Sequence, residues 1–154
     1  MEESTQIGRW TVAYDAVTTR RLYSATEAWD CTCTDCENFR AVGLGAFSPA
    51  LLALLKKLGI DPLKPAELCH IGDTGQEMPT QGWFHFVGRI QHGEDAWRPV
   101  SATGSVLEAE EFSPGEEIGF SNDLALVPEP LRGHPLIQLE FAVTVPWIIG
   151  AQAE

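Results

Sequence analysis

The sequence predicts an α+β fold in which a mostly antiparallel sheet is packed by one main helix. Residues 137–147 alternate apolar and polar side chains with a period of two, as a strand with one buried face does. Residues 82–90 are rich in aromatic and apolar side chains, and residues 48–58 carry leucines at helical spacing. No internal repeat divides the 154 residues. We therefore expect a single domain over residues 1–154.

The amino-terminal third predicts two strands and a short helix. Aromatic and β-branched residues recur at a spacing of two within residues 7–17, which indicates a strand. A second strand is expected over residues 21–29. The short helix follows a cysteine-rich segment, with Thr34 or Asp35 as its N-cap and Gly43 near its end.

The clearest helix covers residues 48–58. Ser48 is a good N-cap and Pro49 suits the first helical position. Gly59 favours a stop directly after the helix. The apolar side chains that share one side of this helix are Leu51, Leu54, Leu55 and Leu58. This pattern predicts that the helix packs on a sheet.

The remaining segments are expected to be strands joined by loops. Residues 61–80 contain several prolines and glycines and predict a loop. The strand at 82–90 has apolar residues on both faces, which favours a central position. A return strand is expected at 97–101, and residues 108–117 predict an acidic surface stretch. Pro146 marks either an edge position or the end of the last strand.

The composition excludes some classes of partner. Asp and Glu number 22 against 10 Lys and Arg, so the formal net charge is -12. Such a surface repels nucleic acids and anionic membranes, whereas a basic protein partner is compatible with it. No stretch approaches the roughly 20 apolar residues of a membrane-spanning helix. The acidic start of the chain is unlike a signal peptide, so we expect a cytoplasmic protein.

The main chemical signal is the cluster of Cys31, Cys33 and Cys36. In an extended segment Cys31 and Cys33 point to the same side, and a following helix brings Cys36 back towards them. Cytoplasmic thiols stay reduced, so clustered cysteines predict metal ligands before disulfides. We therefore expect a zinc site with three thiolate ligands.

The fourth zinc ligand has three candidates: Cys69, His70 and His85. Cys69 would complete a closed site of four thiolates, which is typical of structural zinc. If the fourth position instead held water, the site would favour metal-assisted hydrolysis. His85 has a further interpretation, because a histidine between Phe84 and Phe86 is commonly a core residue.

Two alternatives to a metal site remain open. Cys33 and Cys36 form a Cys-x-x-Cys pair at a helix start, which is compatible with thiol redox chemistry. The neighbouring carboxylates of Asp30, Asp35 and Glu37 are expected to raise the thiol pKa values and to oppose that chemistry. The second alternative is that the cysteines only fill a core.

Several groups of residues stand out as motifs: Cys31-x-Cys33-x-x-Cys36-x-Asn38-Phe39, Leu58-Gly59-Ile60-Asp61-Pro62, Gly82-Trp83-Phe84-His85-Phe86-Val87-Gly88, Gln138-Leu139-Glu140-Phe141 and Val145-Pro146-Trp147. Together these motifs resemble an uncharacterised family of small bacterial proteins. The resemblance implies a grouping and no activity. It places the cysteine cluster, His85 and Glu140 at motif positions and leaves Cys69 outside, which favours His85 over Cys69 as a ligand.

Three functional hypotheses follow from the sequence. The first is a small soluble domain with structural zinc and a partner-binding face. The second is an enzyme that uses the cysteines and His85 for metal-assisted hydrolysis or thiol redox chemistry. The third is an acidic binding protein, of the immunity type, that masks a basic partner.

Overall fold

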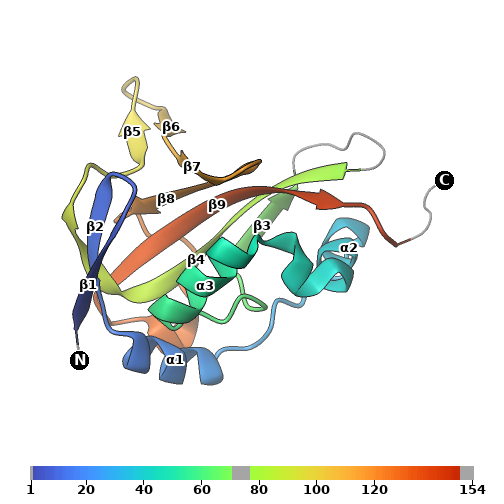
Figure 1. Ribbon diagram of the computed structural model, residues 1–154, viewed down its shortest axis with the longest axis horizontal. Helices are drawn as coiled ribbons and strands as arrows, with labels where there is room; N and C mark the ends of the chain where they lie inside the picture. The colour runs from blue at the N-terminus through green and yellow to red at the C-terminus, as the bar shows by residue number, and fades with distance from the viewer. Residues whose placement is uncertain (1, 71–76, 150–154) are drawn as a thin grey trace.

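The computed structural model describes residues 2–70 and 77–149. Three α-helices and a mostly antiparallel sheet confirm the predicted α+β class (Figure 1). Seven strands form one sheet in the order β1-β2-β4-β9-β8-β7, with β3 also paired to β4, and β5 pairs with β6. The elements of the described residues are β1 (Glu3–Ile7), β2 (Trp10–Tyr14), α1 (Ala16–Ser24), α2 (Thr34–Val42), η1 (Gly43–Ala46), α3 (Pro49–Leu58), β3 (Glu67–His70), β4 (Glu77–His92), β5 (Trp97–Pro99), β6 (Ser105–Leu107), β7 (Glu110–Ser113), β8 (Glu116–Ser121), η2 (Glu129–Leu131) and β9 (Leu136–Pro146).

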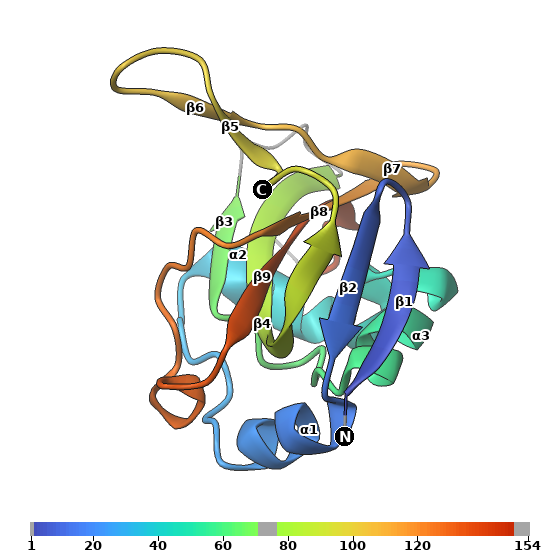
Figure 2. The same cartoon turned by 90° about the vertical axis from the view of Figure 1, so that its left-hand side faces the viewer.

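Strand β4 organises the sheet. It pairs with β9 along one edge, from Glu77 to Val87. On its other edge, β3 pairs with residues 80–83 and β2 pairs with residues 88–92. The central position predicted for residues 82–90 is therefore confirmed. Figure 2 shows that the hairpin of β5 and β6 projects beyond this sheet.

The face of the sheet that α3 covers holds most of the apolar core. Phe84 of β4 and Phe141 of β9 lie on this face, with ring centroids 5.3 Å apart, and Phe47 packs against both. The predicted helix at 48–58 is confirmed, with Ser48 as N-cap and Gly59 in the left-handed conformation after its end. The four leucines predicted to share one side of α3 are all buried. No single helix among the described residues is long and apolar enough to span a membrane, although Thr34–Ala46 and Pro49–Leu58, bent by 90°, reach that length and composition as a pair.

A buried glutamate holds the start of α3. The Ser48 hydroxyl accepts a hydrogen bond from Leu51 N and donates to Glu116 Oε1, while Ser48 N donates to Glu116 Oε2 at 2.9 Å. A carboxylate at this position also complements the positive end of the helix dipole. The acidic surface stretch predicted at 108–117 is therefore wrong for Glu116, which is 4% exposed in the hairpin of β7 and β8.

The strand predicted at 21–29 is wrong, because residues 21–24 belong to α1 and residues 25–29 form neither helix nor strand. Asp15 caps this helix by accepting from Thr18 N, and Tyr23 from the helix fills a gap on the edge of β4 between β3 and β2. The Tyr23 hydroxyl donates to His85 O at 2.8 Å and accepts from His85 N at 3.2 Å. Local β propensity was overridden by the need to satisfy this part of the sheet edge.

Two smaller expectations are also corrected by pairing along the sheet. The loop predicted at 61–80 contains β3 and the start of β4. The return strand predicted at 97–101 is shorter and pairs with β6, not with β4. Pro146 ends β9, as one of the two interpretations of this proline expected.

Candidate metal centre

The three clustered cysteines meet at the start of α2. Cys33 is the N-cap, and its sulfur accepts from Cys36 N at 3.4 Å, so the predicted caps Thr34 and Asp35 are wrong. The Cys31 and Cys33 sulfurs lie 3.4 Å apart, and all three sulfurs lie within 4.8 Å of one another. Zn–S bonds of about 2.3 Å in tetrahedral geometry place sulfurs about 3.8 Å apart. The spacing of the three sulfurs is therefore compatible with a metal site.

Arg40 and Trp29 hold the segment before the helix in place. The Arg40 guanidinium donates to Trp29 O at 3.0 Å and to Cys31 O. The indole Nε1 of Trp29 donates to Cys36 Sγ at 3.2 Å. These contacts fold the extended cysteine segment back over α2, and the cation also places positive charge near the sulfurs. The sequence pattern singled out neither residue as part of the site.

The surroundings of the cysteines shift their pKa values in opposite directions. The backbone amide of Cys33 lowers the pKa of Cys31, and hydrogen bonds with the other two thiols and the charge of Arg40 add to this effect. Burial raises the pKa of Cys36 to about 12. The expectation that neighbouring carboxylates raise the thiol pKa values is wrong for Cys31, whose pKa is lowered, and the raised pKa of Cys36 has burial as its main cause.

His70 approaches the cysteines from the end of β3. Its Nε2 lies 3.4 Å from Cys36 Sγ, close to the separation of about 3.6 Å that a nitrogen and a sulfur take on one zinc ion. Its Nδ1 lies 3.1 Å from the hydroxyl of Thr80, which itself donates to Met78 O. The hydroxyl therefore accepts from Nδ1, and Nε2 keeps a free lone pair directed at Cys36.

The other two candidate ligands lie elsewhere. Cys69 precedes His70 in β3, so its side chain points to the opposite face of the sheet. His85 of β4 also points to that opposite face, where its Nε2 lies 3.0 Å from Gln138 Oε1. The structure thus brings Cys31, Cys33 and Cys36 together and places His70 against Cys36, and it does not bring Cys69 or His85 to them. Side chains alternate between the two faces of a strand, so the register of β3 decides whether Cys69 or His70 faces the cysteines. The sequence did not predict this register.

His85 belongs to a separate, buried polar network. Gln138 Oε1, which faces His85, also accepts from Ala125 N at 2.8 Å, so His85 Nε2 carries the hydrogen. The Gln138 amide donates to Glu140, and Trp97 Nε1 donates to the same carboxylate at 3.0 Å. His85 Nδ1 is buried and has no hydrogen-bond partner among the described residues. The motif positions His85 and Glu140 therefore belong to a buried polar network on the face opposite α3.

Acid is expected to destabilise the fold through His85. Burial lowers the pKa of His85 from its ordinary value of 6.5. As the pH falls below about 6.5, the unfolded state takes up this proton before the native state does, so stability falls. Burial raises the pKa of Glu140, and Asp123 and Asp95 add to the shift. The native state therefore takes up this proton before the unfolded state does, so protonation of Glu140 at lower pH contributes to stability with the opposite sign.

The test is urea unfolding between pH 5 and pH 7.5. The free energy of unfolding of the wild-type protein is expected to fall on acidification more steeply than that of His85→Gln. The difference between the two slopes is expected to be up to about 1.4 kcal/mol per pH unit, the limit for one proton. The glutamine keeps a donor facing Gln138 and removes the titrating group, while the thiols and Glu140 titrate in both proteins. Identical slopes in the two proteins would contradict this role of His85.

Asn38 ties α2 to the end of the last strand and to the residues that follow it. The side chain is fully buried, and its Nδ2 donates to Pro146 O at 3.0 Å. Its Oδ1 accepts from Ile148 N at 2.8 Å and from Ile149 N at 3.2 Å. The sequence offered one signal for this role, which is that Asn38 follows the cysteines in the first motif.

Comparison of the chain with models of protein families, with curated proteins and with solved structures finds no match.

Proposed function

We propose that this chain is a zinc-binding domain in which Cys31, Cys33, Cys36 and His70 hold one structural zinc ion. The observation that carries the proposal is the set of three sulfurs within 4.8 Å of one another. Two thiolates at the 3.4 Å separation of Cys31 and Cys33 repel each other, and a divalent cation offsets this repulsion. Soft thiolate ligands favour zinc over magnesium or calcium.

The proposed fourth ligand closes the site. His70 Nε2 has the free lone pair that a metal ligand needs, and Thr80 orients the ring by accepting from Nδ1. Four protein ligands are typical of structural zinc, whereas catalytic zinc keeps one position for water. This supports the structural role over the hydrolytic one.

A structural ion at this place would join three parts of the fold. The cysteines belong to α2 and the segment before it, and His70 belongs to β3. Through Asn38, α2 also holds the segment that follows β9. We propose that the ion fixes α2 on the sheet and that the acidic surface, with a net charge of -12, serves a basic protein partner.

The experiment is elemental analysis of protein purified without added metal. We expect about one zinc per chain, and a large loss of zinc in Cys33→Ser. Serine is a good N-cap, so this substitution removes a thiolate while α2 keeps its capping acceptor. His70→Ala is expected to bind zinc at least about tenfold more weakly, as loss of a ligand or its support does. The matched control is Cys69→Ser, which is expected to keep full zinc content.

Cobalt substitution and thiol chemistry separate the alternatives. Cobalt bound by three sulfurs and one nitrogen gives a visible spectrum that differs from that of four sulfurs, and His70→Ala is expected to change it. A metal-free protein whose Cys33 and Cys36 form a reversible disulfide would instead favour thiol redox chemistry. A metal-free protein with tight, salt-sensitive binding to a basic protein would favour the masking role. Full zinc retention in Cys33→Ser would contradict the proposed ligands.

A further inference from the structure

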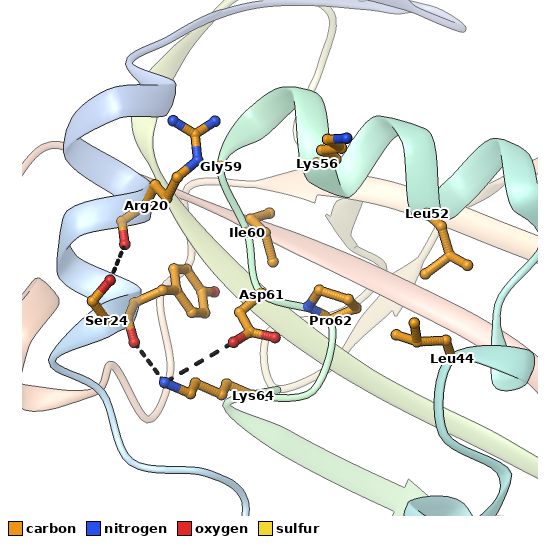
Figure 3. Close-up of a pocket in the computed structure, with 11 residues that line it drawn as sticks. Arg20, Ser24, Leu44, Leu52, Lys56, Gly59, Ile60, Asp61, Pro62 and Lys64 are labelled. Carbon is orange, nitrogen blue, oxygen red and sulfur yellow. Dashed lines mark hydrogen bonds and ion pairs between the residues drawn. The ribbon is translucent and has the colours of Figure 1, made fainter.

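A pocket of about 500 Å³ lies between α1 and α3, apart from both the cysteines and the buried network (Figure 3). Its volume falls within the range of about 300–1,000 Å³ that small-molecule sites occupy. Close approach of the two helices shapes it, because Gly59 at the end of α3 has φ +87° and a Cβ there would lie 2.4 Å from Ala16 O. The backbone of Gly59 therefore packs directly on α1 beside the pocket.

The pocket has an apolar wall. Leu52 of α3, Leu44 of η1 and Pro62 of the loop after α3 line one side, and Leu44 is 49% exposed. Ile60 and Tyr23 are buried at its base. Figure 3 shows Leu44, Leu52 and Pro62 grouped together, away from Arg20. An apolar group of a ligand would remove this wall from water, which favours binding.

The polar lining is cationic in a strongly acidic protein. Arg20, Lys56 and Lys64 all line the pocket, against the single carboxylate of Asp61. Lys64 is already engaged, since its ammonium donates to Tyr23 O at 2.8 Å and lies 4.0 Å from Asp61. The side chains of Arg20 and Lys56 make no hydrogen bond or ion pair with any residue that the structure describes. Figure 3 shows these two side chains at the same rim, one on each helix.

We propose that this pocket binds a small amphipathic carboxylate. The carboxylate lies between Arg20 and Lys56, where two cations on separate helices offer charge-assisted hydrogen bonds. The aliphatic part lies along Leu52 and Pro62. The remainder of the surface, with a net charge of -12, repels anions, so the two cations also select the place at which an anion is accepted. This site is independent of the proposed zinc centre.

Octanoate is the probe, with binding followed by backbone amide shifts in NMR spectra and by calorimetry on the full chain. We expect saturable shifts at residues 20–24 and 56–62. Octylamine has the same tail and the opposite charge, and inorganic phosphate has the charge without the tail. Both are expected to bind at least about tenfold more weakly, as the loss of one charge-assisted contact or of an apolar tail implies.

Two double variants test the role of the cations, and the substituted positions in the control are shifted by one residue on each helix. Arg20→Gln combined with Lys56→Gln is expected to weaken octanoate binding at least about tenfold. Arg21→Gln combined with Lys57→Gln makes the same change in charge on the same two helices outside the pocket, and it is expected to leave binding unchanged. Arg20, Arg21, Lys56 and Lys57 are all exposed, so both variants are expected to fold. Equal loss in both variants, equal binding of octylamine or phosphate, or no amide shift with octanoate would overturn the proposal.

Discussion

Chelation of zinc is expected to lower the free energy of unfolding of the wild-type protein by about 4 kcal/mol. This value compares protein with chelator to protein at a free zinc concentration a thousandfold above the dissociation constant. The physical reason is linkage, because the assembled ligands exist only in the native state. The sulfurs come from one short segment and the imidazole from β3, so the unfolded chain loses most of this affinity. Urea unfolding with zinc and with chelator measures the difference.

The loss is expected to begin locally at α2. Without the ion, this helix is held by the burial of Cys36 and Phe39 and by the hydrogen bonds of Asn38. Amide exchange of residues 34–42 is expected to accelerate on chelation, while the amides of β4 stay protected. Cys69→Ser is the control and is expected to respond as the wild type does. Equal unfolding free energies with zinc and with chelator would contradict a structural role for the ion.

Tyr23→Phe is expected to destabilise the fold by about 2–6 kcal/mol, because each of two buried backbone groups left without a partner costs about 1–3 kcal/mol. The hydroxyl serves both the N–H and the C=O of His85 on an edge of β4 that no strand covers. Burial raises the pKa of Tyr23, so the hydroxyl stays protonated and keeps donating at neutral pH. The phenyl ring that remains fills the same space, so the change isolates the two hydrogen bonds.

Tyr14→Phe is the matched control for this prediction. Tyr14 is also buried, at 3% exposure, but its hydroxyl makes no hydrogen bond with a residue that the structure describes. Its loss is expected to change the free energy of unfolding by less than about 0.5 kcal/mol. Urea unfolding of the two variants under the same conditions gives the comparison. An equal effect of both substitutions would show that the edge hydrogen bonds of Tyr23 carry no special stability.

Elements whose residues contain their own start and stop signals were predictable. The helix at 48–58 has its cap, its leucine face and its glycine stop within a dozen residues, and α3 follows them closely. The last strand has a long period-two pattern, and β9 matches it. In contrast, residues 21–24 carry β-favouring side chains but lie in α1, because Tyr23 satisfies a sheet edge 62 residues away along the chain. Local propensity cannot predict a partner that is distant along the chain.

The sequence did not show that the polar residues of the period-two pattern in β9 are buried. Gln138 and Glu140 occupy the polar alternate positions of this pattern, yet they are 2% and 4% exposed. They are buried because Trp97 and the backbone at Ala125 cover them and satisfy their polar groups. Polar residues in a strand therefore predict either solvent or a hydrogen-bonded interior, and only the surrounding elements decide between the two.

By itself, the sequence determined the main helix and the convergence of the three cysteines, because both depend on contacts between residues close along the chain. It also determined the α+β class, because the periods of helices and strands are visible in local segments. Only the tertiary structure decided that His70, and neither its neighbour Cys69 nor His85, lies beside Cys36. That choice depends on which face of the sheet α2 covers, and a shift of one residue in strand register would exchange the faces. The pocket between α1 and α3 likewise exists only after the two helices have packed on one sheet.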